Sequence, residues 1–154
     1  MRFLDDAAWH SGIRLVIMTS SSLDRTREMQ ARCFEFAARC VLAMRGFAKV
    51  PEAWVVRSQL TRSATSVGAN YRAAGRAMSS RAFIAKLSIA LEEADESSYW
   101  LQLCSRLGLL KPEIVAPLLK EGEELIRIFS ASRRTVRNRE QARSAEGDQR
   151  SPDR

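Results

Sequence analysis

Four consecutive segments of the chain place apolar residues at helical spacing. The segments cover about residues 25–45, 51–77, 80–107 and 112–137. In each of them apolar side chains recur every three or four positions, which is the period of one face of an α-helix. The first stripe is Met29, Cys33, Phe36, Cys40 and Ala43 or Met44, widened by Phe34, Ala37, Val41 and Leu42. The second is Val56, Leu60, Ala64, Val67, Tyr71, Ala74 and Met78; the third is Phe83, Leu87, Ala90, Ala94 and Leu101; and the fourth is Ile114, Leu118, Leu125 and Phe129. The pattern therefore predicts four amphipathic helices.

Short links separate the four segments. Gly46 and Gly108 follow the first and third segments, where glycine commonly ends a helix. Pro51 suits the first position of the second helix, and Ser79 or Ser80 suits the cap of the third. Helices joined by short links pack as antiparallel neighbours. The sequence therefore predicts an all-α fold, an antiparallel up-down-up-down four-helix bundle.

The two ends of the chain lack this pattern. Residues 1–24 show no sustained period and are expected to be poorly ordered, whereas residues 25–137 form the bundle. Residues 138–154 are polar, without aromatic or branched apolar side chains, and are expected to form a disordered basic tail. Met18 is an alternative start, so the sequence leaves open whether residues 1–17 belong to the native protein.

Charge divides sharply along the second and third segments. Residues 53–91 contain no acid but six cations, and four acids follow within residues 92–96. The cations are Arg57, Arg62, Arg72, Arg76, Arg81 and Lys86, and the acids are Glu92, Glu93, Asp95 and Glu96. Two explanations are open: a phosphate-binding surface, or ion pairs within the hairpin or between subunits. A hairpin that turns near residue 78 places Arg62 opposite Glu96, which favours pairing for that arginine alone.

The third segment carries a second stripe on another face. This stripe consists of Ile89, Glu93, Trp100 and Leu107, with Glu96 beside it. A helix with two stripes has two packing partners, so we expect the second stripe to face a neighbouring subunit. Asn70 lies mid-helix, where an amide is a poor helix former, and a buried hydrogen bond that fixes helix register is favoured over a ligand contact. The expected structural or interface polar residues are Arg62, Asn70, Glu93, Glu96 and Trp100.

The hairpin also resembles a known family. The resemblance is carried by RSQLTRSATSVGANYRAA at residues 57–74 and by SRAFIAKLSIALEEADESSYWLQL at residues 80–103, and it extends over about residues 27–136. These stretches are similar to the proteins encoded in intervening sequences of 23S ribosomal RNA genes and, more distantly, to the accessory protein of diversity-generating retroelements. The commoner form of the family follows its asparagine with Ile-Ala-Glu-Gly, whereas here Asn70 precedes Tyr71 and Arg72. A role of the glutamate in Ile-Ala-Glu-Gly therefore cannot be assigned to this chain.

The resemblance implies a four-helix bundle that forms a cyclic homo-oligomer, a homopentamer in known relatives, without enzyme activity. The retroelement relatives are basic and bind nucleic acid and a reverse transcriptase. The net charge of +7 also favours contact with nucleic acid. The candidate nucleic-acid-binding residues are Arg57, Arg72, Arg76, Arg81, Lys86, Arg133, Arg134 and Arg137, for which ordinary solvated surface is the alternative.

Composition argues against other classes of function. His10 is the single histidine, and the three cysteines have no metal-type spacing, so we expect no metal, no cofactor and no enzyme. Cys33, Cys40 and Cys104 suit buried positions in a reducing compartment. No segment has the length of a membrane helix, and the expected location is cytoplasmic. The leading hypothesis is a ring-forming bundle that binds nucleic acid, with RNA preferred; the alternative is a protein-interaction scaffold.

Overall fold

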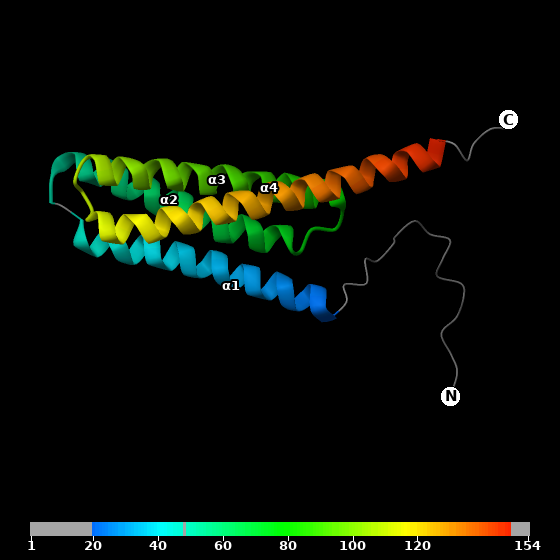
Figure 1. Cartoon of the computed structure of the whole chain (residues 1–154), viewed down its shortest axis with the longest axis horizontal. Helices are drawn as coiled ribbons and strands as arrows, with labels where there is room; N and C mark the ends of the chain where they lie inside the picture. The colour runs from blue at the N-terminus through cyan, green and yellow to red at the C-terminus, as the bar shows by residue number, and fades with distance from the viewer. Residues whose placement is uncertain (1–19, 48, 149–154) are drawn as a thin grey trace.

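The computed structural model describes residues 20–47 and 49–148 as an antiparallel four-helix bundle (Figure 1). The helices are α1 (Ser20–Ala43), α2 (Pro51–Ala74), α3 (Ser80–Arg106) and α4 (Pro112–Asp148), and a short 3-10 turn, η2 (Met44–Gly46), follows α1. Each helix packs against the next, and α4 returns to α1 over a shorter stretch. The predicted fold class is therefore confirmed. No helix in the described part of the chain is long and apolar enough to cross a membrane.

The helix ends follow the expected local signals. Pro51 is the first residue of α2. The Ser79 hydroxyl accepts a hydrogen bond from the Ala82 amide at 3.1 Å and so caps α3. Gly108 has a φ of 65°, which favours glycine, and it ends the third helix as expected. These residues fix the short connections that make neighbouring helices antiparallel.

The core lies between the four predicted stripes. Its fully buried large side chains include Phe36, Leu60, Leu87, Leu101, Leu125 and Phe129. Two stripe positions are wrong: Met78 is fully exposed and Ile114 is 39% exposed. Helix α2 ends at Ala74, because Gly75 weakens the helix there and the chain turns, so Met78 lies in the turn and not on the stripe. Phe34, Val41 and Leu42 do not widen the core; they face solvent.

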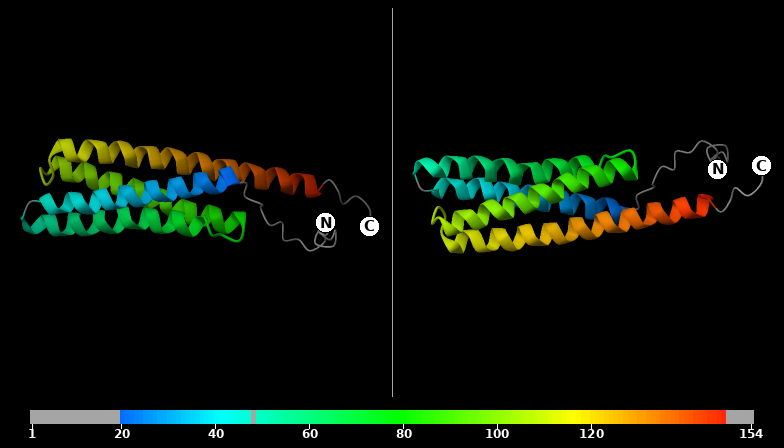
Figure 2. Two further views of the ribbon diagram at one scale, coloured as in Figure 1. Left: turned by 90° about the horizontal axis from the view of Figure 1, so that it is seen from below. Right: turned by 90° about the horizontal axis from the view of Figure 1, so that it is seen from above.

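Two predicted boundaries also differ from the structure. Helix α1 begins at Ser20, and α4 continues through residues 138–148, which were expected to be disordered. Figures 1 and 2 show the last turns of α4 projecting beyond the other helices. Arg, Glu, Gln and Ala are good helix formers, and an Arg143–Glu140 ion pair at 3.3 Å supports this extension without an apolar stripe. The order expected of residues 1–19 and 149–154 lies outside the described residues.

Candidate nucleic-acid interface

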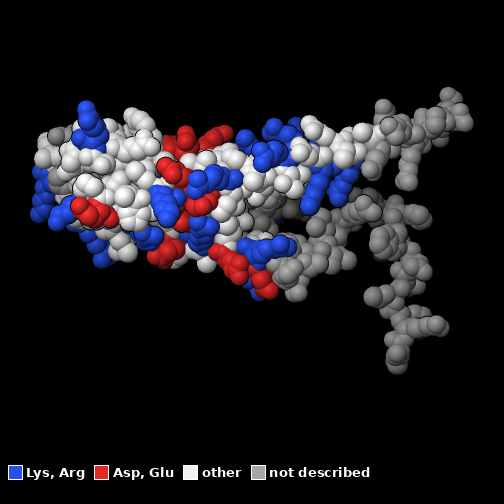
Figure 3. Space-filling model, in the orientation of Figure 1, with Lys and Arg blue, Asp and Glu red and all other residues white. Residues whose placement is uncertain are grey.

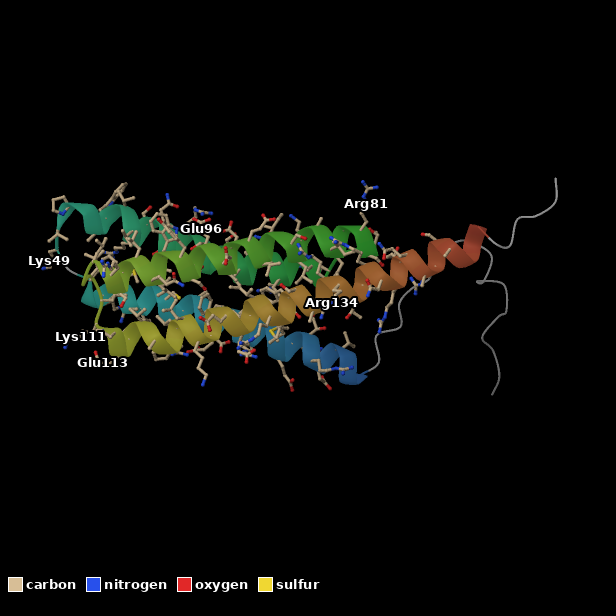
Figure 4. All side chains as sticks on the ribbon, turned by 45° about the horizontal axis from the view of Figure 1, so that its top comes forward. Lys49, Arg81, Glu96, Lys111, Glu113 and Arg134 are labelled. Atoms are coloured by element: carbon tan, nitrogen blue, oxygen red, sulfur yellow. The ribbon has the colours of Figure 1, made fainter. Side chains whose placement is uncertain are left out.

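The structure gathers most of the predicted cations at one end of the bundle. A Cβ atom at Gly75 would lie 3.0 Å from Gln30 Nε2, so the α2–α3 turn lies beside the first turns of α1. The Arg133 guanidinium donates to the Ser88 hydroxyl at 3.3 Å, which places the α4 arginines level with the start of α3. We call the following residues the basic end: Arg72, Arg76, Arg81, Lys86, Arg133, Arg134 and Arg137. Figure 4 shows Arg81 and Arg134 toward this end, with Lys49 and Lys111 at the other.

The cations of the basic end are largely unpaired. Apart from Arg133, none of them makes a side-chain hydrogen bond or an ion pair with a described residue, and all except Arg133 are exposed. Of the three neighbouring acids, Asp24 pairs with Arg27 at 3.7 Å and Glu140 with Arg143 at 3.3 Å, whereas Glu28 makes no ion pair with a described residue. The guanidinium and ammonium groups are therefore free to meet an external anion.

A hollow follows the last turns of α4 at the basic end. It has a volume of about 430 Å³ and is lined by Ser130, Arg133, Arg134, Arg137, Asn138 and Gln141. Its side chains are hydrogen-bond donors and include no carboxylate. Arginine and amide donors of this kind suit phosphate oxygens, so the hollow adds further donors to the basic end.

Arg57 lies apart from the other predicted cations. It borders the α1–α2 connection together with Lys49 and Trp54, at the opposite end of the bundle. At 1.5 Å per helical residue it is roughly 22 Å from Arg72 along α2. The cations of the acid-free segment 53–91 therefore do not form one surface, because Arg57 and Arg72 lie near opposite ends of α2.

Arg62 belongs to an ion-pair cluster on the outer face of α2 and α3, which we call the Arg62 cluster. Its Nη1 atom donates to both Glu93 carboxylate oxygens at 3.1 Å, and its Nη2 atom donates to Glu96. The Trp100 indole donates to the same Glu96 oxygen at 3.0 Å, and Gln59 accepts from Arg62 Nε at 3.2 Å. The expected Arg62–Glu96 pair is therefore present, and Glu93 and Trp100 join it.

In the Arg62 cluster, the pKa of the arginine is raised and the pKa of Glu96 is lowered, as expected when the two charges stabilise each other. The hydrogen bond to Glu96 raises the pKa of Arg62. Hydrogen bonds from Arg62 and then Trp100 lower the pKa of Glu96. The Arg62 side chain is 50% exposed, so the pair adds only about 0.2–1 kcal/mol of stability. Arg62 nevertheless has its charge satisfied within the chain, unlike the cations of the basic end.

Asn70 makes local hydrogen bonds only. Its amide donates to the Ser66 carbonyl and to the Ser66 hydroxyl, both at 3.0 Å, one turn earlier in α2. Both bonds lie within one helix and do not link two helices, so the predicted register role stays a prediction. The buried cross-helix polar contact is instead the Ser97 hydroxyl donating to the Ser63 hydroxyl at 2.9 Å. Ser63 and Ser97 each come one residue after the predicted pair Arg62 and Glu96. The same hairpin register could therefore have predicted their contact.

The cysteines and acids offer no chemistry in the described residues. Cys33, Cys40 and Cys104 are free and buried. Burial raises the pKa of the Cys33 and Cys40 thiols to about 12 and that of Cys104 to about 11, so all three are neutral and unreactive at pH 7. Within residues 20–47 and 49–148 no group of His, Cys, Asp or Glu is arranged to hold a metal ion. His10 lies outside the described residues.

The comparison with known families decides the classification. The model of a family described as 23S rRNA-intervening sequence protein matches residues 25–131. The chain belongs to this family. The match includes α2, α3 and the Arg62 cluster but stops before Arg133, Arg134 and Arg137. The family therefore accounts for the bundle, whereas the arginines on the last turns of α4 lie beyond the matched region.

A solved structure supports the same assignment. A protein of unknown function from the S23 ribosomal protein family of Bacteroides thetaiotaomicron is 32% identical to this chain, with a TM-score of 0.66. The similarity covers 71% of this chain and 98% of that protein. A comparison with curated proteins gives no match.

Proposed function

We propose that this protein is a non-enzymatic, ring-forming helical bundle that binds RNA through the basic end. The observation that carries the proposal is that six exposed cations from α2, α3, α4 and the α2–α3 turn lie at one end without a partner among the described residues. They are Arg72, Arg76, Arg81, Lys86, Arg134 and Arg137. Cations of this kind bind phosphates in any sequence, because phosphate contacts position a nucleic acid without reading its bases.

Charge over the whole end supports this proposal. Residues 24–29, 72–87 and 133–145 together contain eleven arginines and lysines and three acids. Figure 3 shows acidic atoms mainly in the middle of one face, where basic atoms lie among them, and basic atoms toward both ends. A phosphate backbone is therefore attracted more strongly to the basic end than to the middle of the bundle. The experiment below compares RNA with DNA as the ligand.

Exposed apolar side chains support self-assembly. Phe34 is 72% exposed, Val55 and Leu107 are each 50% exposed, and Ile89 is 37% exposed. These residues are distinct from the cations of the basic end, so neighbouring copies can cover them and leave those cations free. The resemblance implies a homopentamer. Such a ring would present several basic ends to one RNA and raise its overall affinity.

A protein-interaction scaffold is the second candidate function. The Arg62 cluster favours it, because there the arginine is used in ion pairs with Glu93 and Glu96 and not in ligand binding. Under this alternative the cations of the basic end would pair with acids of another subunit or of a protein partner.

Binding across a salt series distinguishes the two functions. Fluorescence anisotropy would follow a labelled structured RNA and a duplex DNA with the wild type and with R76Q/R81Q/R134Q. The matched control, R106Q/K111Q/K120Q, removes three exposed cations elsewhere. We expect the wild-type affinity to fall steeply with salt, and the basic-end variant to flatten the slope by about 2–3 on logarithmic axes. Light scattering on the same samples checks that each variant keeps the oligomeric mass of the wild type.

Two results would contradict the proposal. The wild type would fail to bind either ligand at low salt, or both triple variants would weaken binding equally. Equal weakening would mean that net charge alone attracts the ligand. A wild type of monomeric mass at micromolar concentration would refute the ring.

A further inference from the structure

A second hollow lies at the end of the bundle opposite the basic end. It has a volume of about 390 Å³ and is formed by the α1–α2 connection and the first two turns of α2. Its lining consists of Met44, Arg45, Phe47, Lys49, Val50, Ala53, Trp54 and Arg57. Neither the family resemblance nor the basic end accounts for this combination of residues.

The apolar part of the hollow includes a large exposed ring. Met44 and Ala53 form its floor, and each is only 3% exposed. Trp54 is 72% exposed, and it makes no ring contact or hydrogen bond with a described residue. An indole that faces solvent beside a hollow offers its flat face to a planar ligand.

The described charged side chains of the hollow are all cationic. Arg45, Lys49 and Arg57 line it, and no acid with a described side chain does. None of the three makes an ion pair or a side-chain hydrogen bond with a described residue. An aromatic face flanked by unpaired cations matches a ligand that has a planar ring and several negative charges.

We infer that this hollow binds single-stranded nucleic acid, with an unpaired base stacked on Trp54 and the adjoining phosphates held by Arg45, Lys49 and Arg57. Because the ligand is again nucleic acid, this site rests on the proposed function, and the experiment below separates the two. We refer to these four residues as the Trp54 site.

A single strand fits the Trp54 site better than a duplex does. Bases in a duplex are stacked on one another, so their faces are closed to an indole, whereas an unpaired base can stack on it. Three cations also exceed what one mononucleotide phosphate requires. A strand of several nucleotides supplies one phosphate to each.

Tryptophan fluorescence reports on this site directly. A short oligouridylate would be titrated into R76Q/R81Q/R134Q, so that the basic end does not mask the second site. We expect the strand to quench the emission of Trp54. A duplex of equal length and uridine monophosphate serve as the comparison ligands, and both should quench much less.

Substitutions in the Trp54 site test each role separately. W54A should weaken binding of the strand about 10-fold, through loss of stacking. W54F should keep most of the affinity but lose the quenching, because phenylalanine still stacks. R45Q/K49Q/R57Q should reduce the salt slope by about 2. The control is Y99A, which removes another exposed aromatic residue and should change neither the affinity for the strand nor the fraction of emission that the strand quenches. Because Tyr99 lies 5.0 Å from Trp100, the emission of Y99A without ligand is its own reference.

The outcomes separate this site from the basic end. If the strand quenches Trp54 but structured RNA does not bind the wild type, the Trp54 site is supported and the basic-end proposal is refuted. If structured RNA binds but the strand does not quench Trp54, the basic-end proposal is supported and the Trp54 site is refuted. If W54A leaves strand affinity unchanged, or if it changes the oligomeric mass without ligand, the Trp54 site is overturned. In the second case Trp54 would be a protein contact.

Discussion

Two helical glycines allow a sharp test of how the bundle packs. Gly68 lies in α2, where an added Cβ would meet the Cys33 carbonyl oxygen of α1 at 3.6 Å, an ordinary van der Waals distance. Gly122 lies in α4, where an added Cβ would lie 2.7 Å from the Ser98 hydroxyl of α3. Ser98 is buried and donates to the Ala94 carbonyl at 3.1 Å. Replacement of each glycine by alanine should therefore change the free energy of unfolding in opposite directions.

The magnitudes follow from two opposing effects. Alanine in a helix interior is favoured over glycine by about 1 kcal/mol, so G68A should be more stable than the wild type by about that amount. G122A gains the same propensity but crowds the Ser98 hydroxyl, and overpacking of a core costs about 1–3 kcal/mol. We therefore expect G122A to be less stable than the wild type by about 1 kcal/mol.

A double-mutant cycle identifies the cause of the loss. S98A removes the hydroxyl that the new methyl group would meet, so S98A/G122A should be more stable than S98A by about 1 kcal/mol. Urea unfolding followed by circular dichroism at 222 nm measures all four proteins and G68A, at one fixed protomer concentration. The reasoning is refuted if G122A gains stability as G68A does, or if the S98A and G122A changes simply add.

Two further predictions concern ionisation. Because the folded-state pKa values of Cys33, Cys40 and Cys104 are raised by burial, stability should be full below about pH 8.5 and fall as pH rises above it, by up to about 1.4 kcal/mol per pH unit for each thiol. Urea unfolding in a reducing buffer between pH 8 and 10.5 measures this fall, which C40A should make shallower; an equal slope for C40A would contradict it. Because the pKa of Glu96 is lowered in the folded state, its contribution is present at neutral pH and lost as pH falls. R62A should therefore be less stable than the wild type by about 1 kcal/mol at pH 7, and the difference should shrink as the pH falls below about 4.3, the ordinary pKa of a glutamate. A pH-independent difference would show that Arg62 acts through packing.

The spacing of apolar residues and the helix-capping residues predicted the helices, most of the core and the antiparallel hairpin. The 3.6-residue period found most of the core, because burial on one side of a helix requires it. Ser79 marked the start of α3, and the resulting hairpin register placed Arg62 beside Glu96. The predictions failed where the apolar pattern was used beyond a glycine that ends a helix, and where a helix forms without an apolar pattern. Met78 continued a stripe beyond Gly75, and residues 138–148 lacked apolar residues yet form a helix from propensity alone.

The candidate sites depend on distances that the sequence does not express. Arg57 and Arg72 share an acid-free stretch but lie at opposite ends of α2, whereas Arg81 and Arg134 are far apart in sequence and share the basic end. Apolar spacing also could not show that Phe34 and Trp54 face solvent, because an interface residue and a core residue have the same chemistry. The Trp54 site combines a turn and a helix start, and no sequence pattern links the two.

The antiparallel bundle gives the charge division a physical meaning. Each long helix crosses the molecule once, so ten residues of sequence become a layer of about 15 Å. The four acids of α3 fall in the middle layer, where Glu96 pairs with Arg62, and Glu121 of α4 pairs with Arg32 at 2.5 Å. The cations at the basic end make no ion pair with a described acid, so their charge is not neutralised within the described chain. The ion pairs between helices therefore occupy the middle of the bundle, whereas the pairs near the basic end join neighbours on one helix. Much of the unpaired positive charge is left at the ends, where a phosphate backbone can reach it.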